Sequence, residues 1–563
     1  MVDSIVSHPF IPYRNRARYA LGQGRQMEAA RYSKGDTDMA IQGCTRADFL
    51  KMGFASAASL AVLGMAGCAP KASGEGATDS QGVQAADDVA WDKEADFVVV
   101  GMGAGGLGAS LQAIDEGASV IVVEKASIPC GDAQYSHGVI MGSGSRMDDE
   151  AGINVSIEEI ESEAWYLNEI PNMAFAHYTV EQSGELLDWL LDHDMPFNNP
   201  PDFKNIVYSN LPIYHEFEGW GSAFHVLADQ VKEKAQEVLF STRATRLVQD
   251  GTGRVVGVVC NDGKKDLSIK GNAGVILCTG GYGANNALMT AFDPRCDGLP
   301  YEGSPTNTGD GLMMAQSIGA AINTLRCESC YSALVCRHTK MYVNSEIHAQ
   351  GGIFVGVDGK RYARESSELR RRQAILPLEV FQHLKEEGSE WGRIIAPYSE
   401  AVQATIDAGV QMIEADTIEG LAEKMGIDVE GLVSEISRYN AMCEAGFDSD
   451  FRKTEGMVPF TEGPFYGMEV NATVTQTSGG LRTNNNSQVM RFRLYEEGEG
   501  IMEPIPGLYA GGQIIGYEFK WGYALSNALT RGRTAVKHAL GLIPDDGTDS
   551  FTYAYASEGM RVG

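Results

Sequence analysis

The chain has 563 residues, enough for a large core and, judged by length, for two to four domains. A hydrophobic fraction of 44% with 66 glycines is typical of a globular α/β protein and excludes a disordered or fibrous one. Acidic residues number 75 against 45 lysines and arginines, a net charge of −30. This charge argues against nucleic acid or an anionic membrane surface as a partner, because both would repel the chain.

An apolar stretch near the N-terminus, Thr45 to Cys68, predicts an export leader. It has a basic flank at Arg46 and Lys51, an apolar run, and small residues before Cys68. The run is shorter than the roughly 20 apolar residues of a transmembrane helix. The stretch resembles a twin-arginine signal in which Ala47 replaces the second arginine, and its end resembles a lipobox.

Translation from Met39 would leave a signal of ordinary length, because 44 residues precede the apolar stretch. We therefore expect an extracytoplasmic protein, with membrane attachment through a lipid on Cys68 as one form of it. A buried Ala-rich helix is the other interpretation. A Gly/Ser/Ala/Asp linker over 69–91 follows, and the folded chain is expected to begin near Trp91.

A buried β-branched strand over Asp96–Val100 runs directly into the glycine pattern of a dinucleotide-binding turn. Its glycines allow a tight turn, a close approach of backbone to a pyrophosphate, and close packing of helix on strand. They are Gly101, Gly103 and Gly106. A helix to about Glu116 and a second strand over Ser119–Val123 follow. Glu124, at the end of that strand, is placed to accept hydrogen bonds from the adenosine ribose.

Three later segments favour FAD over NAD as the dinucleotide. Gly274–Met289 reads as a buried strand entering a Gly-Gly turn, Asn307–Ala320 as a turn opening a helix, and Pro504–Gln513 as a late strand. One dinucleotide fold revisited by distant segments is expected when an extended FAD is wrapped along its length. An NAD site usually closes within one continuous domain.

The order of these motifs resembles the fumarate reductase/succinate dehydrogenase flavoprotein family, which includes soluble fumarate and urocanate reductases and 3-ketosteroid dehydrogenases. The further motifs that carry the resemblance are "ATRLVQDGTGRVVGVV", "CTGGYG", "NTGDG", "DGKRYARE", "SGGLRT" and "GLYAGGQ". The resemblance implies an α/β fold, a doubly wound, Rossmann-like FAD-binding domain with an inserted α+β capping domain. It divides the chain into a leader (1–68), a linker (69–91), a first FAD-binding part (92–325), a cap (326–461), a second FAD-binding part (462–545) and a tail (546–563).

The resemblance also assigns FAD contacts, with packing glycines and turns as the alternative at each single position. On the ADP side these are Gly101, Gly103, Gly106, Glu124, Lys125 and Ala244. Toward the pyrophosphate, the ribityl chain and the isoalloxazine they are Gly280, Gly281, Gly309, Asp310, Gly512, Gln513, Ser526, Asn527 and Leu529. Gln513 stands where the family has Glu, and "CGDAQYS" (130–136) stands where it has Gly-Gly-Asn-Ser.

The family moves a hydride between flavin N5 and one carbon of an activated C–C bond, while a protein acid or base handles the proton on the neighbouring carbon. In its fumarate reductases the acid is a cap arginine, and the matching stretch here is "DGKRYARESSELRRRQAI". We assign this role to Arg370, with Arg371 and Arg372 next in register. A basic helix face paired with Glu365 and Glu368 is the other interpretation.

Fumarate is a dianion, so burying it requires cations or strong donors around both carboxylates. The family's histidine before Gly479 and Gly480 is replaced by Gln476, and no arginine stands near Tyr523. His338 is the one candidate cationic centre that remains, and we count it among the catalytic candidates. Dedicated fumarate reduction is therefore not expected.

Aromatic and hydrogen-bonding residues stand in place of those cations. The candidates for substrate contact are Tyr331, Gln476, Gly479, Gly480, Glu518 and Trp521, and those for proton transfer are Tyr517 and Tyr523. Tyrosine suits an acid or a polarising group and tryptophan a stacking wall. Glu518 falls at the tyrosine of the steroid dehydrogenases, so that signature is not matched. A flat enone, aryl acrylate or polyphenol would suit these residues; plain packing is the alternative.

The sequence thus predicts an exported, FAD-dependent ene-reductase, an oxidoreductase of anaerobic respiration that acts on a small unsaturated molecule. Without a haem motif, it would take electrons from a separate cytochrome, quinol-linked or flavin protein. The alternatives are a 3-ketosteroid-type dehydrogenase, a fumarate reductase and a flavin electron-carrier lipoprotein. No metal-ligand pattern occurs; Cys327, Cys330 and Cys336 are interpreted as isolated thiols or one disulfide, with an iron–sulfur ligand set left open.

Overall fold

The structure, a computed structural model, describes residues 89–168, 173–198, 211–323, 330–337, 346–365, 370–494, 500–516 and 523–545. The predicted leader, the linker up to residue 88, the predicted tail, and His338, Tyr517, Glu518 and Trp521 lie outside these ranges. Within them, no helix combines the length and the apolar composition that crossing a membrane requires.

The first sheet is built around β1 (Lys93–Val100), whose last four residues are all buried. Such a continuous apolar run is typical of a central parallel strand covered on both faces. β1 pairs in parallel with β2 (Val120–Val123) on one side and β8 (Asp266–Leu277) on the other. The order is β16 (Gln488–Leu494), β17 (Gly500–Ala510), β8, β1, β2 and β5 (Glu237–Leu239), with the hairpin of β6 (Arg243–Gln249) and β7 (Val255–Asn261) paired onto β8.

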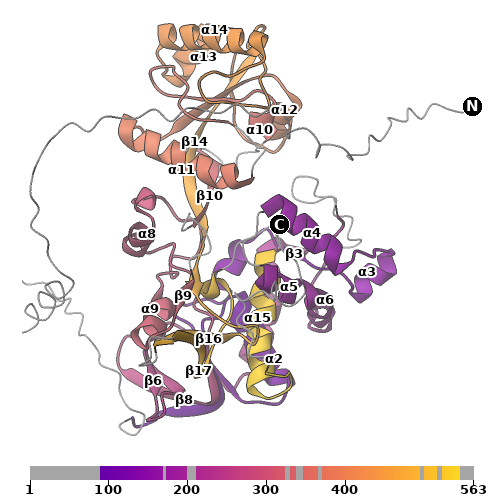
Figure 1. Ribbon diagram of the computed structural model, residues 1–563, viewed down its shortest axis with the longest axis vertical. Helices are drawn as coiled ribbons and strands as arrows, with labels where there is room; N and C mark the ends of the chain where they lie inside the picture. The colour runs from indigo at the N-terminus through magenta and orange to yellow at the C-terminus, as the bar shows by residue number, and fades with distance from the viewer. Residues whose placement is uncertain are drawn as a thin grey trace, which may run out of the picture. The chain divides into compact units, whose positions relative to one another are not determined.

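Helices α2 (Ala104–Asp115) and α15 (Tyr523–Ala539) lie against each other (Figure 1), although more than 400 residues separate them. Glycines let the two backbones touch. A Cβ added at Gly532 would lie 2.1 Å from the carbonyl oxygen of Gly105. A Cβ at Gly108 would lie 2.9 Å from the carbonyl oxygen of Leu529. Helix α15 is thereby fixed to the helix that follows the dinucleotide turn.

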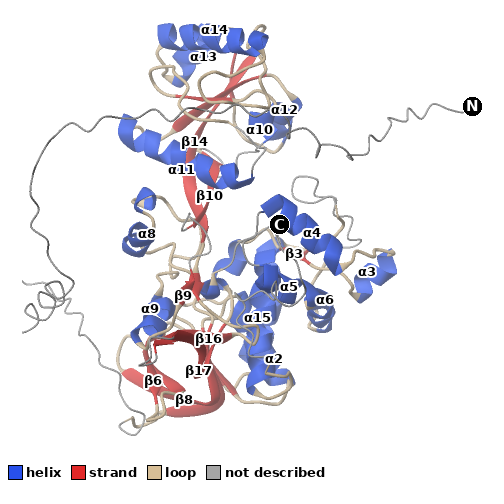
Figure 2. Cartoon of the chain, viewed as in Figure 1, coloured by secondary structure: helices blue, strands red, loops and turns tan. Residues whose placement is uncertain are grey.

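A second, antiparallel sheet is inserted into this fold (Figure 2). Its order is β10 (Cys330–Cys336), β14 (Phe465–Thr477), β12 (Gly392–Pro397) and β11 (Ile353–Val355), with β13 (Ile413–Ala415) also paired to β14. Helix α11 (Arg370–Glu387) packs on β10 and β14, and α13 (Ile418–Met425) packs on β13 and on α14 (Val429–Ala445).

The insertion leaves and rejoins the first part of the fold at one place. Strands β9 (Ile322–Asn323) and β15 (Gly480–Leu481) pair with each other, so Asn323 faces Gly480. Strand β14 runs on to Thr477, past the predicted end of the cap at Thr461. The predicted α/β fold class with an inserted α+β part is confirmed, and its finer limits stay predictions.

Candidate active site

The glycine turn after β1 has the backbone geometry that a pyrophosphate needs. Gly101 has φ +99°, and its N–H donates to Val123 O at 2.7 Å. A Cβ at Gly106 would lie 1.9 Å from the carbonyl oxygen of Gly101, so only glycine fits. Gly103 is the N-cap of α2 and offers no side chain to its first N–H groups. These donors and the positive end of the helix suit a phosphate.

Glu124 follows β2 and points back at the glycine turn. Its carboxylate accepts the N–H of Met102 at 2.7 Å on one oxygen and the N–H of Ala126 at 2.6 Å on the other. Burial raises the pKa of this carboxyl, against the effect of those two hydrogen bonds. Each oxygen keeps a lone pair, which fits a ribose with two hydroxyl donors.

Lys125 and Asp310 belong to an ion cluster that joins three elements. Lys125 Nζ donates to Asp310 Oδ2 at 2.9 Å, and Arg243 makes a bidentate pair with the same carboxylate at 2.9 and 3.0 Å. Burial opposes ionisation, but these partners hold the pKa of Asp310 below its usual range. The cluster fixes the start of α9 (Asp310–Ser317) beside β6, which carries Ala244; the ribityl contact predicted for Asp310 stays a prediction.

The late segments converge on the same turn. Gly512 has φ +82° and lies against Gly105. A Cβ added at Gly105 would be 3.0 Å from the backbone nitrogen of Gly512. A Cβ at Gly280 would be 2.2 Å from Asn307 Oδ1. A Cβ at Gly281 would meet Thr477 and, at 3.1 Å, the Gln513 amide carbon. These distant glycines form one wall, as expected for an extended dinucleotide.

The first turns of α15 supply polar groups to this region. Ser526 Oγ donates to Met141 O at 2.6 Å and accepts from its N–H at 3.1 Å, which ties α15 to β3 (Val139–Met141). Asn527 is fully buried; its Oδ1 accepts from Thr179 at 3.1 Å. Its Nδ2 has no partner among the described residues. A buried, unpaired donor calls for an acceptor, and a bound FAD would fit Asn527 in this respect. Leu529 is fully buried in the core beside α2.

The predicted substrate strand ends on the cofactor segment. Tyr331 pairs with Gln476 across β10 and β14. Beyond β14, a Cβ at Gly480 would lie 2.0 Å from Ile514 O, and one at Gly516 would lie 2.4 Å from Gly479. The backbone of Gly479 and Gly480 therefore lies directly on η5 (Gln513–Ile515) and the residue after it. The fold brings predicted substrate and cofactor residues together here.

A family model described as an FAD binding domain matches residues 96–528. The chain belongs to this family. The chain is 27% identical to the digoxin reductase of Eggerthella lenta over 89% of its own length and 98% of that protein's. It is 29% identical to the vinyl phenol reductase of Lactiplantibacillus plantarum over 74% and 89% of the two chains. The open conformation of a flavocytochrome c3 fumarate reductase superimposes with a TM-score of 0.65 at 25% identity, covering 80% of this chain and 79% of that one.

The protein is thus a flavoprotein of the fumarate reductase/succinate dehydrogenase type, which confirms the resemblance, the FAD cofactor and the class of enzyme, an oxidoreductase acting on CH–CH groups. The structure assigns no reactive role by itself to the catalytic candidates. Arg370 begins α11. Tyr523 is buried against β3 and β4 (Tyr214–Glu216), and burial raises its pKa well above the ordinary value, so its phenol stays protonated.

The alternative interpretation of Arg370 pairs it with Glu365, but Glu365 already has another arginine as its partner. Arg361 and Glu365 have fully buried side chains 2.7 Å apart. Arg361 also contacts Asp448 at 3.0 Å, and Glu365 accepts the N–H of Phe354 at 2.9 Å. The carboxylate of Glu365 is therefore already engaged inside the cap. Glu368 lies outside the described residues.

The clustered cysteines show no metal geometry that the structure describes. Cys336 is buried, with its sulfur 3.9 Å from that of Met468, and Cys327 lies outside the described residues. In the described ranges, no three His, Cys, Asp or Glu side chains gather as a metal site. The iron–sulfur alternative stays untested.

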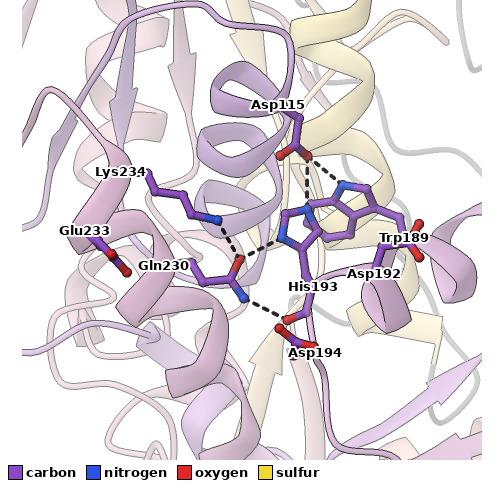
Figure 3. A pocket seen from close by; sticks show the side chains of 8 residues that line it. All are labelled: Asp115, Trp189, Asp192, His193, Asp194, Gln230, Glu233 and Lys234. Carbon is purple, nitrogen blue, oxygen red and sulfur yellow. Dashed lines mark hydrogen bonds and ion pairs between the residues drawn. The ribbon is translucent and has the colours of Figure 1, made fainter.

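A pocket of about 530 Å³ lies at the far end of α2 from the glycine turn (Figure 3). Asp115 Oδ2 accepts from His193 Nε2 at 3.0 Å and from Trp189 Nε1 at 3.0 Å. His193 Nδ1 faces Gln230 Oε1 at 2.9 Å. Both ring nitrogens thus face acceptors, which favours the doubly protonated imidazolium. Sequence reasoning did not single out these residues, because they come together only through folding. A 12-residue helix, about 18 Å, separates this pocket from the phosphate end.

Sequence reasoning also passed over a polar cluster inside the cofactor region. Asp132, Tyr301 and Asn307 meet there, beside Gln513. Asp132 stands in "CGDAQYS", where the chain departs from the family pattern, but nothing near it in the sequence indicates its partners.

Proposed function

We propose that this flavoprotein reduces an activated C=C bond in a neutral or singly charged, ring-bearing substrate such as an enone, an aryl acrylate or a polyphenol. The observation that carries this proposal is Gln476, a half-buried, uncharged amide at the end of β14, next to the segment that lies on η5. Gln476 cannot supply the cation that the family's histidine would give to a dicarboxylate at this place, and burying an unpaired carboxylate is strongly unfavourable.

Two of the relatives support the same class of substrate. These two relatives, which the chain matches over most of their length, are named for digoxin and vinyl phenol. Vinyl phenol is an aryl alkene. The flavocytochrome, named for fumarate, keeps dicarboxylate reduction as the rival function. The two functions differ in the charge that the site must hold, so a panel of substrates separates them.

The chain's own residues would perform binding, orientation and proton transfer. Bound FAD supplies the hydride. Gln476 would orient the polar end of the alkene by hydrogen bonds, and the backbone of Gly479 and Gly480 would bring the substrate against the cofactor segment. Arg370, at the start of α11, would give a proton to the carbon next to the one that is reduced. Tyr523, protonated because it is buried, is suited to polarising a carbonyl but not to acting as a base.

The remaining parts of the proposal concern export and electron supply. The leader over residues 45–68 supports an extracytoplasmic protein, attached to the membrane if Cys68 carries a lipid. A separate cytochrome, quinol-linked or flavin protein would then reduce the FAD. Respiration on the alkene is the role that this arrangement supports.

An anaerobic assay of reduced methyl viologen oxidation tests the reaction. The FAD-loaded protein is given fumarate, urocanate, a cinnamate, a hydroxystyrene and an enone steroid in parallel. We expect turnover with at least one of the last three and little with fumarate. Gln476→Ala should lower kcat/KM by about 10-fold, the value of one hydrogen bond. Rapid turnover of fumarate alone would refute the proposed substrate class, and dye reduction by saturated ketosteroids would favour the dehydrogenase direction.

A further inference from the structure

The short helix η2 (Gly131–Tyr135) enters the cofactor region directly beside the phosphate-binding turn. Cys130, with φ +79°, donates its N–H to Met102 O at 2.8 Å. A Cβ at Gly131 would lie 3.4 Å from the Cα of Gly103, the N-cap of α2. Asp132 is the next residue. Its carboxyl therefore lies close to the glycine turn and the N-terminus of α2, which suit a pyrophosphate.

Every polar group that meets Asp132 in the described residues donates to it. Tyr301 O–H donates to Oδ2 at 2.7 Å, and the N–H of Ser304 donates to Oδ1 at 2.5 Å. Asn307 Nδ2 donates to Oδ2. The amide of Gln513, turned so that both of its ends are satisfied, donates Nε2 to Oδ2 at 2.9 Å and accepts Thr477 N–H at 2.9 Å.

These partners are neutral, and Tyr301 is the titratable one among them. The hydrogen bonds of Asp132 and Gln513 connect η2, the segment 301–307, the end of β14 and η5. The phenol of Tyr301 is fixed in turn, since its ring lies against Gly283 and Gly303 and its oxygen accepts from Asn307 Nδ2 at 2.9 Å. The carboxylate thus organises four segments of the cofactor wall without a cation bonded to it in the described part of the chain.

A pyrophosphate at the N-terminus of α2 would bring negative charge close to this carboxylate. Two like charges in a partly buried site repel each other, and the repulsion is relieved when the carboxyl takes up a proton. Burial already raises the pKa of Asp132, against the hydrogen bonds of Ser304, Tyr301 and Asn307.

We propose that Asp132 is a cofactor-positioning residue that takes up a proton when FAD binds. The step is a binding equilibrium in which ionised protein, FAD and one proton give the complex with a neutral Asp132. The pKa of the carboxyl is then higher with FAD than without it. The sign follows: FAD binds more tightly at low pH, and this extra affinity is lost as the pH rises through the pKa of the complex. The inference concerns the cofactor site and does not depend on the substrate class proposed above.

Calorimetric titration of the full-length apoprotein with FAD, in two buffers of different ionisation enthalpy, measures the protons taken up. We expect net uptake, up to about one proton per FAD, in the pH range between the two pKa values, where the dissociation constant should change about 10-fold per pH unit. Asp132→Asn, which cannot ionise, should show neither the uptake nor that pH dependence. Asp148→Asn is the matched control: it changes another buried carboxylate, paired with His215 and Ser145, and should keep both.

Two further measurements keep the proposal open to refutation if Asp132→Asn does not fold. Tyr301→Phe removes one donor to the carboxylate and should move the uptake profile to higher pH. On the wild-type holoenzyme, dilution at a series of pH values with flavin fluorescence as the readout should show more FAD released as the pH rises. An unchanged profile in Tyr301→Phe, no proton uptake by the wild type, or equal uptake by wild type and Asp132→Asn would overturn the proposal.

Discussion

Single residues in this protein are assigned to structure or to chemistry by the partners they have. Glu365 is held by Arg361 in a fully buried pair, so it contributes to the interior of the cap. Sequence pattern alone left it as a surface partner of the arginines at 370–372. Glu365 is therefore already engaged and is a poor partner for Arg370, whose catalytic role stays a prediction.

If Arg370 delivers the proton, Arg370→Gln should lower kcat by about 10² to 10⁴-fold, the usual contribution of a placed acid. FAD content and KM should change little, because the residue acts after both have bound. Steady-state kinetics with visible absorbance of the bound flavin check this. Arg371→Gln and Arg372→Gln serve as controls; a larger loss in either would move the assignment along the helix.

His193 makes a contribution to stability that depends on pH. Burial lowers its pKa, but hydrogen bonds to Asp115 and Gln230 outweigh burial and raise it above the ordinary value. Because the folded-state pKa exceeds that of the unfolded chain, about 6.5, the contribution is complete below that value and is lost as the pH rises through the folded pKa. His193→Asn should therefore reduce the free energy of unfolding by about 1–2 kcal/mol more at pH 5.5 than at pH 9.

Urea unfolding of both proteins at the two pH values measures this difference. Asp115→Asn should remove most of the pH dependence as well, because it takes away the charged acceptor. Equal losses at both pH values would mean that His193 is held only by packing against Trp189, whose ring centroid is 4.3 Å away.

At the scale of elements, the contact between α2 and α15 connects folding to cofactor binding. Gly105 and Gly532 let the helices touch, and Arg533 on α15 donates to Gln112 on α2 at 2.9 Å. The same α2 presents its N-terminus to the phosphates. A small displacement of α15 should therefore shift α2 and change the affinity for the cofactor.

Gly532→Ala should lower the free energy of unfolding by a few kcal/mol, about 1–3 for overpacking, and should also weaken FAD binding. Its new Cβ would meet the backbone of Gly105, which cannot turn away as a side chain can. Thermal unfolding and FAD titration give the two readouts. Gly420→Ala in α13 is the control: its Cβ would meet Thr417 Oγ1 at 3.3 Å and no closer atom. A fully active, FAD-replete Gly532→Ala would contradict the close packing.

At the scale of the whole molecule, the net charge of −30 governs encounters with electron donors. An acidic surface attracts cations and accelerates their association, and salt screens the attraction over about 10 Å at 0.1 M. Oxidation of the methyl viologen radical cation should therefore slow several-fold between about 20 and 200 mM salt. Stopped-flow absorbance at constant FAD occupancy measures it, with a neutral reductant as the control. A rate that rises with salt would point to a basic patch at the donor site.

The sequence by itself determined the local parts of this protein. The strand β1, the glycine turn, α2 and β2 lie where the apolar runs and the positions of Gly101, Gly103 and Gly106 predict, because these depend on neighbours a few residues apart. The motif order likewise identified the family and the cofactor. Gln476 and Gly480 were predicted as substrate residues from their place in "TQTSGG", and that role stays a prediction.

Only the tertiary structure decided which distant groups meet. Asp132 comes together with Tyr301, Asn307 and Gln513 over a span of 381 residues, and Asp115 with His193 over 78. Neither meeting has a local signal, since such contacts depend on how the sheet and its helices pack and not on propensity. The charge state of a buried carboxyl or imidazole follows from those contacts. The sequence thus indicated the cofactor and the class of reaction. Folding decided which side chains come together around the cofactor site.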